Sequence, residues 1–137
     1  MTSELPITRQ VLREVNEYLR HIKSWQVILV LTACRLVDDG TAYLASLAFP
    51  PDVFAKAEVN RAFILFVTGR NPFSLPAQEV VYLLVPIMLF LTAKHGKPNH
   101  LGTLVLWSMF IFLFGWVLVG SLAASILNLT AIVMYWM

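Results

Sequence analysis

The sequence predicts an all-α, polytopic membrane protein with three transmembrane helices, preceded by an amphipathic helix at the membrane surface. Hydrophobic residues make up 58% of its 137 residues, and charged residues make up 13%. Soluble domains contain about 45–50% hydrophobic residues and about 25% charged residues. The hydrophobic residues form blocks long enough to cross a bilayer, which takes roughly 20 residues per helix. We therefore expect an amphipathic juxtamembrane helix in residues 1–24 and a single transmembrane helical domain in residues 25–137.

Residues 8–24 have the periodicity of an amphipathic helix. Hydrophobic side chains recur three or four positions apart, and basic side chains occupy much of the other surface. A basic amphipathic helix beside a transmembrane segment usually lies in the plane of the lipid headgroups. A plain cytoplasmic extension of the first span is the alternative. Because the segment is polar, it does not look like a cleavable signal peptide, and we expect the first hydrophobic span to remain as an anchor.

The first span is expected at about 25–49, where Pro50 and Pro51 end it because prolines cannot continue a helix. A short helix is expected at about 53–68, and it is too polar and too short for an ordinary span. We expect this helix to lie at the interface or to re-enter the membrane, where protein or water must satisfy its backbone. Gly69 is a natural residue to end it.

The second span is expected at about 77–94 and the third at about 101–127 or longer. The hydrophobic run from Leu101 continues to Met137, which is about 55 Å of helix and exceeds the roughly 30 Å hydrocarbon core. No polar turn interrupts the run, so we favour one long or kinked third helix. A chain reversal near Gly120-Ser121, which would produce four spans, is the alternative.

The distribution of basic residues predicts the orientation of the chain. Six lysines and arginines lie before the first span or between the second and third, and three lie on the other side. Cytoplasmic segments carry the excess of lysine and arginine. We therefore expect a cytoplasmic N-terminus and, with three spans, a C-terminus on the outer side.

The heptapeptide CRLVDDG, residues 34–40, places three charged residues in the middle of the first span. On a helix, Arg35 lies three residues before Asp38 and four before Asp39, the spacings at which side chains meet. Each charge at bilayer depth costs about 2.5–3.5 kcal/mol. Pairing of Arg35 with one aspartate removes much of this cost, and the other aspartate then needs a partner, a proton, a cation or water.

The short helix supplies the first candidates to complete this cluster. Glu58, Asn60 and Arg61 lie near its beginning. If the helix folds back toward the first span, Glu58 or Arg61 can approach the outer half of that span.

The last span supplies the second group of candidates. Ser121, Ser125 and Asn128 are spaced by four and three residues and form one polar stripe. Gly120 and Ala124 lie beside the stripe at a spacing that permits close approach of helices. We expect the polar stripe and the aspartates to face one another.

Three interpretations of the charged cluster remain open. It can pin helices together, bind a proton, cation or small polar ligand, or contact a partner subunit. The net charge of +2 and the lack of a basic arm argue against nucleic-acid binding. His95 and His100 lack a positioned third ligand, so we expect no metal site. We find no motif for a cofactor, and the lone Cys34 cannot form an internal disulfide.

The order of these features resembles a family of small uncharacterised prokaryotic integral membrane proteins. Its members carry an aspartate in the first span, a Glu-x-Asn-Pro element about twenty residues later and an asparagine near the end of the last span. Asp38 or Asp39, then Glu58 and Asn60, and then Asn128 match this pattern over roughly residues 25–130, while Arg61 stands where the family has proline. The resemblance implies a prokaryotic cell membrane, a shared architecture and a shared polar site.

These observations favour a non-enzymatic membrane protein that acts as an accessory, assembly or structural subunit, or as a homo-oligomer. Its expected partners are the lipid bilayer and other membrane subunits or further copies of itself. A small oligomeric transporter or channel, with Asp38, Asp39 and Glu58 binding a proton or cation, is the alternative. A membrane enzyme that uses the same carboxylates is a second alternative.

Overall fold

The computed structural model describes residues 7–58, 60–97 and 100–137. These residues form six helices and no strands: α1 (Ile7–His21), α2 (Ser24–Ala48), α3 (Pro51–Ala57), α4 (Arg61–Val67), α5 (Ser74–His95) and α6 (Leu101–Trp136). The all-α fold class is therefore confirmed. Three stretches lie outside the described residues: residues 1–6 at the start of the predicted N-terminal segment, Val59 between Glu58 and Asn60, and residues 98–99.

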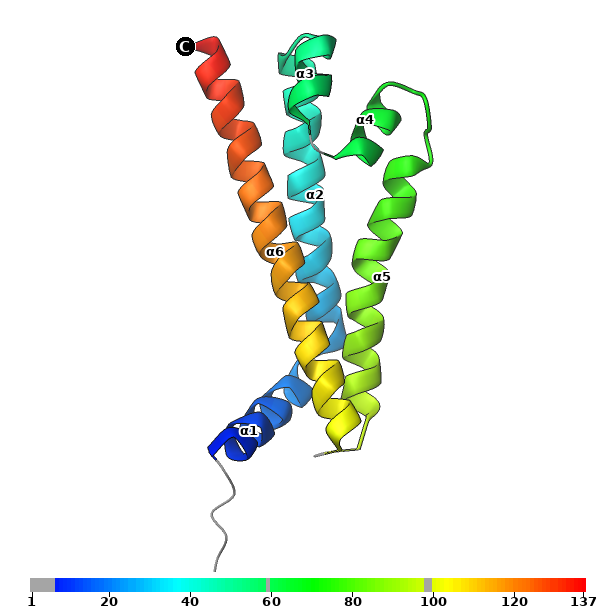
Figure 1. Ribbon diagram of the computed structural model, residues 1–137, viewed down its shortest axis with the longest axis vertical. Helices are drawn as coiled ribbons and strands as arrows, with labels where there is room; N and C mark the ends of the chain where they lie inside the picture. Colours follow the sequence, from blue (N-terminus) through cyan, green and yellow to red (C-terminus); the bar gives the residue numbers. More distant parts are fainter. Residues whose placement is uncertain (1–6, 59, 98–99) are drawn as a thin grey trace, which may run out of the picture.

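The three long helices α2, α5 and α6 form a splayed bundle (Figure 1). Helix α6 packs against both α2 and α5. The helices converge where α5 passes into α6, and α5 diverges from α6 toward the other end. Helix α1 crosses the converging end, and α3 and α4 lie at the diverging end.

The boundaries of the long helices agree closely with the expected ones. Helices α2 and α5 each begin and end within three residues of the predicted first and second spans. Helix α6 runs without interruption through Gly120 and Ser121 to Trp136. The alternative of a chain reversal at that point is therefore wrong, since the hydrophobic run contains no residue that stops a helix there.

The prediction of one short helix over residues 53–68 is wrong, because the segment forms two helices, α3 and α4. The side chain of Asn60 accepts hydrogen bonds from the backbone N–H groups of Ala62 and Phe63, at 3.1 and 3.2 Å. Such a cap satisfies backbone donors at the start of a helix, so α4 begins afresh after Asn60. Helix α4 ends before Gly69, whose φ of 69° is the left-handed conformation that glycine adopts without strain.

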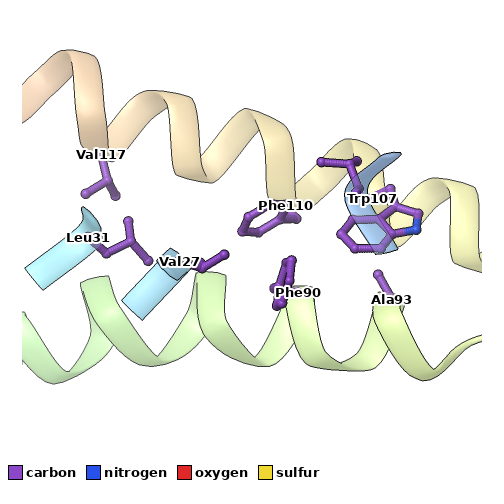
Figure 2. Close-up of a cluster of buried hydrophobic side chains, with 8 residues drawn as sticks. Val27, Leu31, Phe90, Ala93, Trp107, Phe110 and Val117 are labelled. Carbon is purple, nitrogen blue, oxygen red and sulfur yellow. The ribbon is translucent and has the colours of Figure 1, made fainter. Parts of the chain in front are cut away.

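A hydrophobic core holds the converging end together (Figure 2). It joins Val27 and Leu31 of α2, Phe90 and Ala93 of α5, and Trp107, Phe110 and Val117 of α6, with Leu19 of α1. The ring centroids of Phe90 lie 5.6 Å from those of Trp107 and 5.2 Å from those of Phe110. Aromatic pairs at these separations contribute beyond their buried area. The core therefore joins the three long helices at one end, and a second, smaller cluster of Ala42, Ala45, Phe54 and Phe63 packs at the other.

Helix α1 is fastened to the turn between α5 and α6. The Arg20 guanidinium donates hydrogen bonds to the carbonyl oxygens of Lys94 and Gly96, and the Lys94 ammonium donates to the carbonyl of Ile22. Of the hydrophobic residues on α1, Leu19 is buried against the bundle, whereas Tyr18 is exposed. The apolar surface of α1 is thus only partly covered by the chain itself.

Two of the helices, α5 and α6, are long and apolar enough to cross a membrane, which by itself is weak evidence for membrane location. Helix α2 has 25 residues but carries Arg35, Asp38 and Asp39 near its middle, and it is not one of these two helices. The charged cluster is therefore what distinguishes α2 from the other two long helices.

Candidate functional site

Arg35 is the centre of the charged cluster, and it is buried in the bundle. A guanidinium has five N–H donors in a fixed planar arrangement. The five hydrogen bonds of Arg35 go to Glu79 twice (2.7 and 2.6 Å), Asp38 (2.5 Å), Asp39 (3.3 Å) and Ser121 (3.1 Å). Its donors are all in use, so Arg35 ties α2 to both α5 and α6.

Glu79 is the principal site residue that sequence reasoning missed. It lies on α5, 44 residues after Arg35, and accepts two parallel hydrogen bonds from it. Paired bonds of this kind are among the strongest contacts between charged side chains. The available signal was a single carboxylate near the start of an otherwise hydrophobic helix, which at bilayer depth would need a cation.

The cluster has more acidic than basic groups. Arg35 contributes +1 and Asp38, Asp39 and Glu79 contribute −3, so the formal sum is −2. The side chain of Arg35 is 10% exposed, and those of the three carboxylates are 15%, 22% and 18% exposed. Within the described chain, one oxygen of each aspartate accepts a side-chain hydrogen bond, from Arg35. The other oxygen of each is available to a further donor.

A cavity of about 590 Å³ adjoins the cluster. It lies between α2, α5 and α6 on the side where these helices diverge in Figure 1, and the start of α4 borders it. Its wall includes the buried residues Arg35, Phe63 and Ser121. It also includes Trp116 and Leu127, which are 67% and 68% exposed, so the cavity reaches the surface of the chain.

The structure brings most of the predicted site residues to this one cavity. The lining residues among them are Arg35, Asp38, Asp39, Glu58, Asn60, Arg61, Gly120, Ser121, Ala124 and Asn128. Ser125 is buried behind the wall, and its hydroxyl donates to the carbonyl of Ser121. The polar stripe contacts the first long helix through Arg35 to Ser121 and Asn128 to Thr41, and no hydrogen bond among the described residues joins it to the side chains of the aspartates.

Glu58 and Asn60 reach the cavity but also serve the local fold. The Glu58 carboxylate accepts a hydrogen bond from the backbone N–H of Asn60 at 2.7 Å, and the Asn60 side chain caps α4. Arg61 lines the cavity as an exposed side chain. In the described residues, neither Glu58 nor Arg61 forms an ion pair with α2, so the expected approach brings them to the same cavity without direct pairing.

The expected close helix contact at Gly120 is absent within the chain. A Cβ atom at Gly120 would meet no atom within 4 Å of it among the described residues. Both Gly120 and Ala124 face the cavity, because α6 presents them to the space left as α5 diverges. Glycine here leaves room beside the charged cluster, and contact with a second chain at this position stays a prediction.

Aromatic and amide side chains complete the wall. Tyr82 lies under the Arg35 guanidinium, with 4.9 Å between the Arg35 Cζ atom and the ring centroid. Gln78 of α5 and Trp116 of α6 also line the cavity. Tyr82, Gln78 and Trp116 were not predicted as site residues, because their spacing along the sequence does not indicate which face of each helix points toward the cavity.

The donor set does not form a metal centre. No group of three or more His, Cys, Asp or Glu side chains within the described ranges is arranged to hold a metal ion. Asp38, Asp39 and Glu79 instead pair with the guanidinium of Arg35.

No family model, curated protein or solved structure matches this chain. The resemblance to the prokaryotic membrane family therefore stays a prediction.

Proposed function

We propose that the chain is an integral membrane protein in which α2, α5 and α6 cross the bilayer, with the N-terminus in the cytoplasm. Helix α2 is about 37 Å long at 1.5 Å per residue, and large hydrophobic side chains such as Leu29, Leu36 and Leu47 are exposed along it. Soluble monomers rarely expose continuous apolar surfaces of this extent. Pairing of Arg35 with Asp38, Asp39 and Glu79 lowers the cost of holding charges at the middle of α2.

The function we propose is that of an accessory, assembly or structural subunit, which works together with further copies of itself or with other membrane proteins. The observation that carries this proposal is the cavity beside the charged cluster, because the cluster has a formal charge of −2 and the cavity reaches the surface at Trp116 and Leu127. Lipid tails offer no hydrogen bonds and charges are costly at that depth. A second polypeptide over the opening would keep hydrocarbon away from the carboxylates.

Cross-linking in native membranes tests this proposal. A single cysteine at Leu127, at the mouth of the cavity, would be introduced with Cys34→Ala and treated with a short bismaleimide. The matched control is a cysteine at Leu84, which is also exposed but does not line the cavity. We expect a cross-linked product of defined mass from position 127 and none from position 84. Assembly over the cavity would be contradicted if the protein is a monomer in mild detergent and the two positions cross-link equally or not at all.

A small transporter or channel for a cation is the second candidate. The surplus negative charge of the cavity favours it, because an acidic cavity attracts cations and repels anions. Its test is cation uptake into proteoliposomes, in which Asp39→Asn should abolish transport while the reconstituted amount of protein stays unchanged. Uptake equal to that of the unaltered protein would remove Asp39 from any transport role.

A further inference from the structure

We propose that the cavity beside Arg35 binds a primary organic ammonium ion. The inference names the ligand of the second candidate function, but it does not require transport, and it holds whether or not the chain assembles with others. It rests on four features of the cavity: the sign of its charge, the unused acceptors, its volume and the composition of its wall.

The surplus negative charge beside the cavity favours a cation from outside the chain. Arg35 has no remaining N–H donor, because its five donors already contact Glu79, Asp38, Asp39 and Ser121. Arg61 is the other arginine in the wall, but it is exposed and forms no ion pair with any described residue. A carboxylate that is partly removed from water is stabilised by a nearby cation. A bound cation beside Asp38 and Asp39 would supply it.

The unused acceptors match the donors of an ammonium group. Asp38 and Asp39 each use one oxygen for Arg35 and keep the other available within the described contacts. The cavity wall adds the amide side chains of Gln78 and Asn128, whose carbonyl oxygens are further acceptors. A primary ammonium has three N–H donors and no acceptor. It can therefore satisfy both aspartates and one amide at once, which a quaternary ammonium cannot do.

The volume and the arrangement of the carboxylates favour an organic ion over a metal ion. Cavities of about 300–1,000 Å³ are typical of sites for organic ligands, and this cavity measures about 590 Å³. No set of three or more metal-binding side chains converges in the part of the chain that the structure describes. A single metal ion would leave most of the cavity unfilled.

The wall offers apolar surface for the body of such a ligand. Phe63, Trp116, Val117 and Leu127 line the cavity together with the carboxylates. An aromatic face close to a cation adds favourable electrostatic attraction. The combination of carboxylate acceptors and apolar side chains in one wall suits an amine attached to a hydrocarbon or aromatic group.

Titration calorimetry of the full chain in detergent tests this proposal with phenethylammonium as the probe. Phenethyl alcohol is the uncharged isostere, and Na⁺ and Mg²⁺ salts serve as inorganic cations at equal ionic strength. We expect saturable binding of phenethylammonium, at least tenfold weaker binding of phenethyl alcohol, and no competition by Mg²⁺ beyond the effect of ionic strength. Equal affinities for the amine and the alcohol, or displacement of the amine by Mg²⁺ alone, would overturn the inference.

Two variants connect any binding to the cavity. Asp39→Asn removes a surplus charge and should weaken binding at least tenfold. Gly120→Leu projects a side chain into the cavity, where a Cβ meets nothing within 4 Å, and should also weaken binding at least tenfold with an unchanged melting temperature. Gly115→Leu, on the same helix but outside this cavity, is the matched control and should bind normally. Binding that survives both cavity variants would contradict the assignment.

The outcomes also separate this inference from the proposed assembly. A protein that binds the amine but remains a monomer in membranes would support the ligand and contradict the assembly. A protein that cross-links through position 127 but does not bind the amine would support the assembly and contradict the ligand.

Discussion

Replacement of Arg35 by leucine is the perturbation to which the fold should be most sensitive. Arg35 is the only cation that pairs with Asp38, Asp39 and Glu79 in the described part of the chain. Four of its five hydrogen bonds go to these carboxylates and the fifth goes to Ser121. Leucine would leave three neighbouring carboxylates without a counter-charge and would break the ion pair that joins α2 to Glu79 of α5.

The expected loss follows from the burial of these groups. Removal of one partner from a buried ion pair costs about 3–5 kcal/mol, since the remaining charges stay buried. The three carboxylates are 15–22% exposed, so water reaches part of each and moderates their repulsion. We therefore expect the lower end of that range, a decrease of about 3 kcal/mol in the free energy of unfolding.

Equilibrium unfolding in mixed micelles of mild detergent and SDS, followed by circular dichroism, measures this loss. Arg61→Leu is the matched control, because Arg61 lines the same cavity but is exposed and makes no ion pair with a described residue. Exposed substitutions of this kind usually change stability by no more than about 0.5 kcal/mol. Equal stability of Arg35→Leu and the unaltered protein, or equal losses in both variants, would refute the reasoning.

Three further predictions concern the charged set, the turn before α6 and the membrane topology. A combined variant with Arg35→Leu, Asp38→Asn, Asp39→Asn and Glu79→Gln removes the whole charged set. In the same assay, it should recover at least half of the stability that Arg35→Leu alone loses. No recovery would show that packing and not charge causes the loss. Gly96→Ala should lower the free energy of unfolding by about 1–3 kcal/mol, since the new Cβ would lie 2.5 Å from the Thr103 hydroxyl oxygen. The Cβ of Gly115→Ala would meet nothing within 4 Å, so this control variant should not lower the free energy of unfolding. Cysteines at positions 10 and 97 should react with an impermeant maleimide added on the cytoplasmic side, and a cysteine at position 70 should react with the reagent added on the other side. Reaction of positions 10 and 97 on opposite sides would contradict the topology.

Features that depend on one stretch of sequence were predicted well. The lengths of α2, α5 and α6 follow from the hydrophobic runs and from Pro50, which stops α2. The spacing on one helix predicted that Arg35 pairs with one aspartate, and the structure pairs it with both Asp38 and Asp39. In each case the residues that decide the outcome lie within a few turns of one another.

Features that depend on how helices meet were predicted less well. Spacing on α5 alone could not identify Glu79 as the strongest partner of Arg35, since that contact depends on the rotation of α5 in the bundle. The glycine and alanine at positions 120 and 124 indicate only that close approach is possible, and α5 diverges before it is made. The division into α3 and α4 was accessible in principle, because Asn60 is a favoured capping residue.

The depth of the charged cluster in the bilayer is the central claim, and a spin label at Leu36 tests it most directly. Leu36 adjoins Arg35 on α2, and it is 67% exposed on the surface that would face lipid. In liposomes, we predict that dissolved oxygen relaxes this label more strongly than a water-soluble nickel chelate does, while a label at Lys97 shows the opposite preference. Stronger relaxation of the Leu36 label by the nickel chelate would put the cluster in water and contradict the account.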